Sequence, residues 1–284
     1  MSRAPLLAAL LLTSIIPTAS AESRARIVAL DISPLQSAQS LVWVAAHADD
    51  EVIVAPLLAS LCVERRGKCT VIILTRGEKG VCLLSGGCDP SLSAVRSAEA
   101  GLSSQYFGAD LVLLNLADGG GGDNGLAGGW EEEMGGREPL LRMLAAYIAA
   151  AGADAVLTYD PRHGTTCHGD HRAVGRLVGE ALARIAEPPP LYYVETRIDV
   201  NPEGPAISFA PAGPMAPGFA FDANRELAGL GHSGWDALIR AMRIHRSQFD
   251  EGWIQAARAV PHNRRAVWVV PAGVALEMEV SSCH

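Results

Sequence analysis

Short apolar runs rich in β-branched residues alternate along this 284-residue chain with longer stretches of helical periodicity. The apolar runs occupy residues 41–46, 70–74, 111–116, 155–159 and 191–195. Between them, residues 51–66, 91–107, 138–151 and 171–186 carry apolar side chains at helical spacing. Strands that alternate with helices predict a mostly parallel sheet covered by helices. We therefore predict an α/β fold, a Rossmann-like three-layer sandwich, with ligands bound beyond the carboxyl ends of its strands.

Two segments interrupt this alternation. Residues 119–136 are rich in glycine, and residues 201–218 are rich in proline, glycine and alanine. Both predict long loops, which in compact domains usually serve as binding lids or surface segments. Nearer the end, residues 235–249 predict a helix and residues 266–270 a closing strand. The chain contains no internal repeat or separate linker, so we predict a single domain over residues 22–284.

The first 21 residues have the pattern of a signal peptide. Arg3 precedes an uncharged apolar run over residues 6–16, which is followed by the small residues Ala19, Ser20 and Ala21. The run is shorter than the roughly 20 residues that a membrane span requires. We expect cleavage after Ala21, a periplasmic or secreted location, and no integral membrane anchor.

Six cysteines fit export into an oxidising compartment. Two close pairs, Cys62 with Cys69 and Cys82 with Cys88, would each close a short loop. The alternative is that these residues are unpaired buried thiols. Cys167 stands beside a motif histidine, where it could be mistaken for a metal ligand, and a pairing with Cys283 is open.

The overall charge is acidic, with a formal net charge of −8 and only two lysines. This balance argues against a nucleic-acid partner or an anionic membrane surface. A small neutral or cationic ligand is favoured.

A first cluster of chemistry-bearing residues follows the strand predicted over residues 41–46. His47, Asp49, Asp50 and Glu51 stand at the carboxyl end of that strand and at the start of a helix. Acidic residues at a helix N-terminus often serve only as caps. The histidine three residues before Asp50, however, would bring an imidazole nitrogen and a carboxylate oxygen to one metal ion and leave Asp49 free.

A second cluster follows the strand predicted over residues 155–159. It contains His168, Asp170 and His171 and also opens a predicted helix. Each histidine alone is as easily a solvated loop residue. Two sets of histidine and carboxylate at the same sheet edge, each with a spare carboxylate, predict a functional site.

Together the two clusters resemble the signatures of the PIG-L (LmbE-like) family of zinc-dependent N-deacetylases. The same family pattern is matched by residues 75–80 (TRGEKG), 158–161 (TYDP) and 245–248 (HRSQ), and by Arg96 with Glu99. The likeness extends from about residue 41 to about residue 250. The chain departs from the pattern at Ala48 and Gly169, where the family usually has proline, and at Thr166, where some members have tyrosine.

The resemblance implies a zinc ion held by His47, Asp50 and His171, with Fe²⁺ possible in its place. Two histidines and one carboxylate leave coordination positions open for water and a substrate carbonyl. Asp49 is implied as the general base.

Further roles concern residues around the metal. A protonated His168 would stabilise the developing oxyanion or protonate the leaving amine, and Asp170 would keep His168 charged. Arg96 and Asp123 correspond to residues that bind sugar hydroxyls, although Arg96 could instead pair with Glu99 and Asp123 could serve a turn. The expected reaction is removal of the acetyl group from an N-acetylglucosamine-type sugar, oligosaccharide or glycolipid.

Two other classes of function are consistent with some of the same residues. His47, Asp49 and His171 also match the facial triad of Fe(II) oxygenases, but that class uses a β-rich fold. A secreted carbohydrate-binding protein without catalysis would use the same cleft, but it would not require Asp49 and His168.

Overall fold

The computed structural model describes residues 32–121, 129–200, 207–211, 213, 220–275 and 283. Contacts divide the chain into two compact units, residues 1–30 and 31–284, and every described residue lies in the second. The predicted signal peptide and Asp123 lie outside the described residues.

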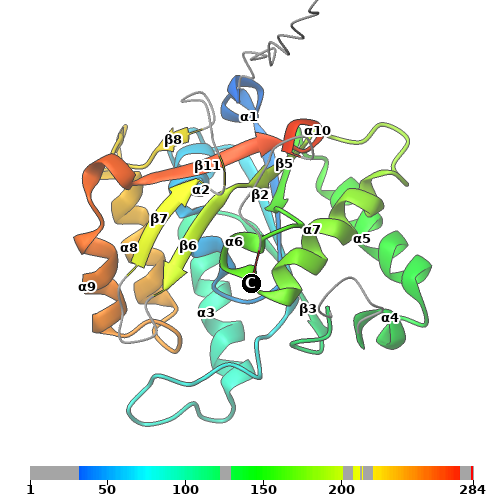
Figure 1. Cartoon of the computed structure of the whole chain (residues 1–284), viewed down its shortest axis with the longest axis horizontal. Helices are drawn as coiled ribbons and strands as arrows, with labels where there is room; N and C mark the ends of the chain where they lie inside the picture. The colour runs from blue at the N-terminus through cyan, green and yellow to red at the C-terminus, as the bar shows by residue number, and fades with distance from the viewer. Residues whose placement is uncertain are drawn as a thin grey trace, which may run out of the picture. The chain divides into compact units, whose positions relative to one another are not determined.

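One mixed sheet of seven strands forms the centre of this unit (Figure 1). The strand order is β3 (Asp110–Leu116), β2 (Lys68–Thr75), β1 (Ser40–Ala45), β4 (Ala155–Tyr159), β5 (Leu191–Val194), β11 (Ala266–Pro271) and β8 (Ala220–Asp222). The first five strands are parallel to one another, while β11 runs antiparallel to both β5 and β8. This arrangement confirms the predicted α/β fold with a mostly parallel sheet.

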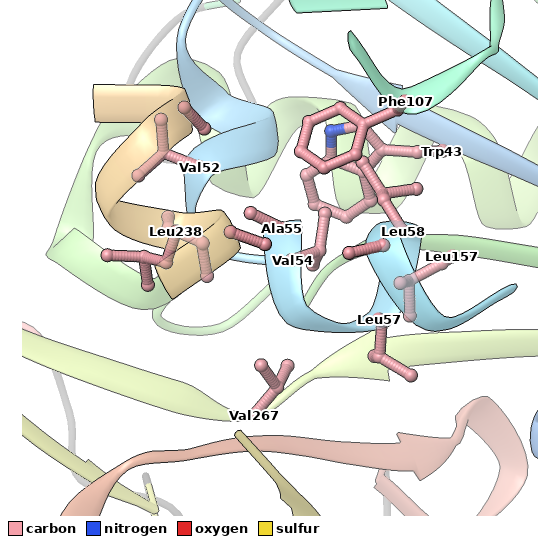
Figure 2. Close-up of a cluster of buried hydrophobic side chains, with 14 of the residues drawn as sticks. Trp43, Val52, Val54, Ala55, Leu57, Leu58, Phe107, Leu157, Leu238 and Val267 are labelled. Carbon is pink, nitrogen blue, oxygen red and sulfur yellow. The ribbon is translucent and has the colours of Figure 1, made fainter. Parts of the chain in front are cut away.

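Alternate side chains of the central strand β1 enter two different hydrophobic cores, one on each face of the sheet. Trp43 packs in the core covered by α2 (Ala55–Leu58), α3 (Leu92–Phe107), α8 (Gly234–Ile244) and α9 (Glu251–Ala259), as Figure 2 shows in part. Its neighbour Val44 packs in the core covered by α4 (Gly129–Glu133), α5 (Arg137–Ala151) and α7 (Gly169–Leu182). The two cores make the predicted three layers.

The helix predicted over residues 51–66 is divided into three parts. A 3₁₀ helix, η1 (Asp50–Val52), comes first, followed by α2 and then by the π-helix η2 (Ala59–Glu64). Pro56 stands in the first turn of α2, where its missing N–H is tolerated but cannot continue the preceding hydrogen bonds. The segment therefore covers the sheet as predicted, in shorter and less regular pieces.

The prediction of a loop over residues 201–218 is wrong for residues 207–211. Residues Ile207–Pro211 form strand β7, which pairs antiparallel with β6 (Thr196–Val200). Burial of one aromatic residue explains the strand, because Phe209 packs edge-on against Trp235 of α8 with ring centroids 5.0 Å apart. Proline and glycine around this short run concealed it in the sequence.

The helix predicted over residues 235–249 ends earlier, at Ile244. His245 adopts a non-helical conformation, and its buried ring contacts Glu51 near the end of β1. A further helix, α9, follows at Glu251–Ala259 and begins with Asp250, whose side chain accepts the N–H of Trp253. The predicted strand at residues 266–270 is present as β11.

The remaining elements are short. They are α1 (Ser33–Ser37), α6 (Gly164–Cys167), β9 (Glu226–Leu227), β10 (His232–Ser233), η5 (His262–Arg264) and α10 (Ala272–Ala275). Of the predicted loop over residues 119–136, residues 129–133 form α4 and residues 122–128 lie outside the described ranges.

Three disulfides cross-link the unit. Cys62–Cys69 and Cys82–Cys88 are the two predicted short-range pairs, and Cys167–Cys283 links residues 116 positions apart. Cys167 is therefore not a metal ligand. Within the described ranges, every helix is too short or too polar to cross a membrane.

Candidate metal centre and active site

The two predicted clusters meet at the carboxyl ends of the neighbouring strands β1 and β4. From β1 the chain adds β2 and β3 on one side of the sheet, and then β4 and β5 on the other side. The point between β1 and β4 where the order changes direction leaves a crevice at the sheet edge. His47 follows β1 directly, and His168 and His171 lie at the start of α7. The topology therefore brings together residues that are 124 positions apart.

Three predicted metal-ligand atoms face one another in this crevice. His47 Nδ1 lies 3.3 Å from His171 Nε2, and Asp50 Oδ1 lies 3.1 Å from His171 Nε2 and 3.6 Å from His47 Nδ1. All three side chains are buried. These separations match those between ligands bound to one zinc ion at about 2.0–2.2 Å in tetrahedral geometry. The residues present therefore fit the predicted metal.

The other polar atoms of these three residues are held by the protein. Asp50 Oδ2 accepts the backbone N–H groups of Ala46 and His47, at 2.9 and 2.8 Å. His171 Nδ1 donates to the carbonyl of Gly164 at 2.9 Å, and its ring stacks on Tyr159 with centroids 4.1 Å apart. This support fixes which nitrogen and which oxygen face the centre, as outer contacts do in metal sites.

Two carboxylates contact the ring of His47 at Nε2, the nitrogen that faces away from His171 and Asp50. Its Nε2 lies 3.2 Å from Asp118 and 3.3 Å from Asp170. Burial acts to lower the pKa of His47, but the charge of Asp50 and hydrogen bonds to Asp118 and Asp170 raise it well above its usual value. Asp118 was not among the predicted site residues, although its position just beyond the carboxyl end of β3 was a usable signal.

The contacts of Asp50 are consistent with an ionised ligand. Burial acts to raise the pKa of its carboxyl, but the facing rings of His171 and His47 hold that pKa well below the usual range. In the described structure the carboxylate is paired on both sides, by backbone N–H groups and by imidazole rings.

Asp49 stands beside these ligands without joining them. Its backbone has a φ of 126°, which an L-residue rarely adopts and which is often found at functional sites. Its Oδ1 accepts a hydrogen bond from Arg96 at 2.7 Å, while burial raises the pKa of the carboxyl against the opposing effect of Arg96. A carboxylate that is turned toward the pocket, with its pKa raised, suits proton transfer.

Arg96 lies at the centre of a backbone network. Its guanidinium donates to the carbonyls of Ala48 and Gly77 as well as to Asp49, and its side chain is buried. The close packing explains Gly77, since a Cβ there would lie 2.3 Å from the guanidinium. Arg96 thus holds Asp49 in place, and the predicted contact with sugar hydroxyls stays a prediction.

The predicted acid His168 caps helix α7. Its Nδ1 accepts the backbone N–H of Asp170 at 3.2 Å, so in the neutral ring the proton is on Nε2. Burial, together with His171 and His47, lowers the pKa of His168, and these effects outweigh the opposing charge of Asp170. The surroundings therefore favour a neutral His168, in contrast to the protonated ring predicted from the sequence.

The carboxylate of Asp170 is directed elsewhere than predicted. Its oxygens accept the N–H groups of Gly119 at 2.7 Å and Gly121 at 2.9 Å, besides contacting His47. It therefore joins the loop after β3 to the ring of His47. Its part in the reaction stays a prediction.

The short segment before His168 has an uncommon backbone. Gly164, Thr165 and Cys167 all have positive φ values, of 55°, 63° and 60°. Glycine is required at the first position, because a Cβ there would lie 2.7 Å from that of His171. The disulfide from Cys167 to Cys283 fastens this segment, which supplies the carbonyl that orients His171.

A cavity of about 510 Å³ opens over the ligand atoms. Polar residues line one part of it, among them Asp49, Lys79, Asp118, Thr166 and His168. Apolar residues line another part, among them Ile198, Ile207, Phe209, Leu238, Met242 and Trp253. The cavity has the size and the mixed lining of a small-molecule site.

A second buried group with possible metal ligands lies at the end of β4 and β5. It consists of Asp160, His163 and Glu195. Arg162 already supplies a cation to both carboxylates, and His163 donates from Nε2 to Glu195 at 3.0 Å because its Nδ1 accepts the N–H of Thr165. This group satisfies its own charges and makes a poor metal site.

The ionisation of Glu195 in this group should make the stability of the folded protein depend on pH. Burial raises the pKa of Glu195 from 4.5 to about 7. Between these values the folded protein holds a proton that the unfolded chain has released, so the free energy of unfolding falls as the pH rises from about 4.5 to about 7. Glutamine mimics the protonated acid and does not titrate. We therefore expect the fall in the free energy of unfolding between pH 4.5 and 7 to be smaller in Glu195→Gln than in the wild type, by on the order of 1–3 kcal/mol.

Thermal melts of the two proteins across this pH range would measure the effect. The exposed Glu187 provides the control, Glu187→Gln, which should follow the wild-type curve. Parallel curves for wild type and Glu195→Gln would show that Glu195 does not titrate in this range.

Comparisons with known proteins bear on the family and on the fold. Residues 42–182 match the model of the PIG-L family, described as GlcNAc-PI de-N-acetylase. No curated protein matches the chain. The N,N'-diacetylchitobiose deacetylase from Pyrococcus horikoshii is 18% identical, with a TM-score of 0.56 and coverage of 84% of this chain and 85% of that chain.

Two other solved structures share the fold. The 4-carboxy-2-hydroxymuconate hydratase GalB from Pseudomonas putida is 17% identical, with a TM-score of 0.56 and coverage of 82% of this chain and 95% of that chain. The conserved protein TT1542 from Thermus thermophilus is 22% identical, with a TM-score of 0.53 and coverage of 82% of this chain and 94% of that chain. Because a hydratase and a deacetylase share this fold, the fold alone does not decide the reaction. The family match, which contains both clusters, does identify the family of this segment: residues 42–182 of the chain form a PIG-L family domain.

Proposed function

We propose that this protein is an exported, zinc-dependent deacetylase that hydrolyses the amide of an N-acylated amino sugar or glycoconjugate. The observation that carries the proposal is the convergence of His47, Asp50 and His171 on one point, with Asp49 beside them and outside the ligand set. The family match supports the same reaction class. His47, Asp50 and His171 are the residues that would hold the metal.

When bound, zinc polarises the amide carbonyl and lowers the pKa of water at the site. Asp49 takes up the proton of the water that attacks the carbonyl carbon. Arg96 keeps the Asp49 carboxylate aimed into the pocket through its hydrogen bond of 2.7 Å. The same carboxyl group then returns the proton to the leaving nitrogen as the carbon–nitrogen bond breaks, so the products are a carboxylic acid and a free amine.

His168 donates a hydrogen bond to the oxygen that becomes negative during attack. Its neutral ring carries the proton on Nε2, because Nδ1 is occupied as the cap of α7. A fixed donor of this kind stabilises the developing charge without first having to be protonated. Asp118 and Asp170 hold the ring of His47 and thereby the position of one ligand atom.

The polar part of the cavity suits a sugar. Asp118 and the backbone of Gly119 line it together with Lys79, so donors and acceptors for hydroxyl groups stand next to the ligand atoms. Asp123 lies outside the described residues, and we retain it as a proposed sugar contact. Three disulfides support an oxidising compartment outside the cytoplasm, as the N-terminal sequence predicts.

The test is release of free amine from N-acetylglucosamine, its chitobiose and a glycolipid conjugate by the zinc-loaded protein. We expect turnover with at least one of these substrates, abolished by a chelator and restored by added zinc. Sugar binding without amine release would favour a carbohydrate-binding protein. Activity that requires Fe²⁺ and a 2-oxoacid would favour an oxygenase.

A further inference from the structure

We propose that the preferred substrate carries an N-acyl chain longer than acetyl, and that this chain lies against the apolar part of the cavity. The inference rests on the proposed function, because it concerns the acyl group that the site removes. It is drawn from the distribution of polar and apolar side chains around the ligand atoms.

The cavity has two chemically different sides. Lys79, Asp118, Thr166 and His168 line one side, which is formed by the loops after β2, β3 and β4. The other side is formed by the β6–β7 hairpin and helices α8 and α9. It presents Ile198, Ile207, Phe209, Leu238, Met242 and Trp253.

The apolar side begins next to the metal ligands. Val52 follows Asp50 by two residues in η1, lines the cavity and lies beside Leu238 of α8 (Figure 2). Leu238 and Met242 are one helical turn apart on the same face of α8 and are both almost fully buried. Hydrocarbon surface therefore extends outward from the point where the carbonyl of a substrate would lie.

Packing holds this surface in place before any ligand binds. Phe209 packs edge-on against the buried Trp235, and the rings of Phe249 and Trp253 meet edge-on with centroids 6.5 Å apart. The hairpin strand that carries Ile207 is paired over its whole length with β6. A preformed apolar surface costs little conformational entropy when a chain binds to it.

The structure of an amide then indicates which part of the substrate lies on each side of the cavity. With the carbonyl at the ligand atoms, the nitrogen substituent and the acyl substituent must point in different directions. The sugar on nitrogen matches the side with hydrogen-bonding groups, and the acyl chain matches the hydrocarbon side. A methyl group alone would leave most of the apolar part of the cavity unfilled.

The experiment uses glucosamine acylated with acetyl, butanoyl, hexanoyl or octanoyl groups. All four substrates release the same amine, so one assay for glucosamine compares them directly. We expect kcat/KM to rise by about fourfold for each methylene that becomes buried, until the apolar side is filled. Octyl glycosides of N-acetylglucosamine form a second series, in which the alkyl chain is attached on the sugar side.

A substitution that fills the apolar side should remove the preference. We expect Ile207→Trp to lower the ratio of octanoyl to acetyl kcat/KM at least tenfold, with Ile198→Trp as a second variant on the partner strand. Leu102 lies exposed on α3 away from the cavity lining, so Leu102→Trp is the matched control and should keep the wild-type ratio. Melting curves would verify that each variant is folded.

Binding of the acid product gives an independent measurement. Trp253 lines the apolar side, so octanoate should change the tryptophan fluorescence of the zinc-loaded protein at much lower concentration than acetate. Trp253→Phe should remove most of the change.

The outcomes separate the two proposals. A kcat/KM that is flat or falls beyond acetyl overturns the acyl-chain inference and leaves the deacetylase intact. A gain from the octyl glycosides alone would also overturn it, because the apolar side would then bind the group attached to the sugar. Absence of amine release from every substrate would overturn the proposed function itself.

Discussion

Replacing Asp49 with asparagine should lower the turnover number by roughly 10²–10⁴ while the protein still binds its metal. Asparagine has the same shape, and its side-chain oxygen can still accept the hydrogen bond from Arg96. Asparagine also tolerates positive φ better than most residues, so the backbone at 126° is disturbed little. The variant thus removes the proton acceptor and leaves its surroundings in place.

Two measurements are needed to interpret this variant. Zinc content per chain should equal that of the wild type, and amine release from the best substrate should fall. The control is Asp222→Asn, the same substitution at an exposed carboxylate on β8, for which we expect wild-type turnover. Near-normal turnover in the metal-loaded Asp49→Asn protein would remove Asp49 from the reaction.

The contacts of Arg96 also favour a catalytic role for Asp49. The guanidinium joins Asp49 to the backbone of Ala48 and Gly77, so the base is held by two loops of the sheet edge. A carboxylate in a capping role alone would not need a buried cation to aim it. The contacts of Arg96 were not deducible from the sequence, since they depend on how the loop after β2 folds over the loop after β1.

The sequence was most informative where periodicity and topology act together. Parallel strands place their carboxyl ends at one edge, so the residues after β1 and β4 were expected to meet, and His47 and His171 do so. Burial on both faces makes β1, β2 and β4 nearly continuous apolar runs, which are easy to recognise. The fold and the meeting of the two clusters therefore followed from local patterns.

Other features depend on contacts that no local pattern contains. The β6–β7 hairpin is stabilised by Phe209 on Trp235 of a distant helix, while its own segment is rich in loop-forming residues. The pairing of Cys167 with Cys283 spans 116 positions. The place of Asp118 just beyond β3 puts it at the same sheet edge, but its contact with the ring of His47 is visible only in the structure.

Replacing His171 with alanine should abolish zinc binding and, with it, detectable turnover. His171 would contribute one of the three proposed ligand atoms, so its loss should weaken metal binding by more than the roughly 10–100-fold typical of outer contacts. Alanine also removes the ring that stacks on Tyr159 and the hydrogen bond to Gly164, so the melting temperature should fall as well. Zinc content after dialysis, measured by elemental analysis, is the readout.

The matched comparison is His168→Ala, because the ring nitrogens of His47, His168 and His171 all lie within 4.8 Å of one another and each is a possible ligand. His168 has Nδ1 engaged as the cap of α7, and its proposed role is to donate a hydrogen bond, so its removal should leave zinc in place and lower only turnover. Asp50 makes the third contact with the ligand nitrogens of His47 and His171, whose separations match a single ion. Full zinc content in His171→Ala together with loss of zinc in His168→Ala would exchange the roles of the two histidines and assign the metal to a different set of ligands.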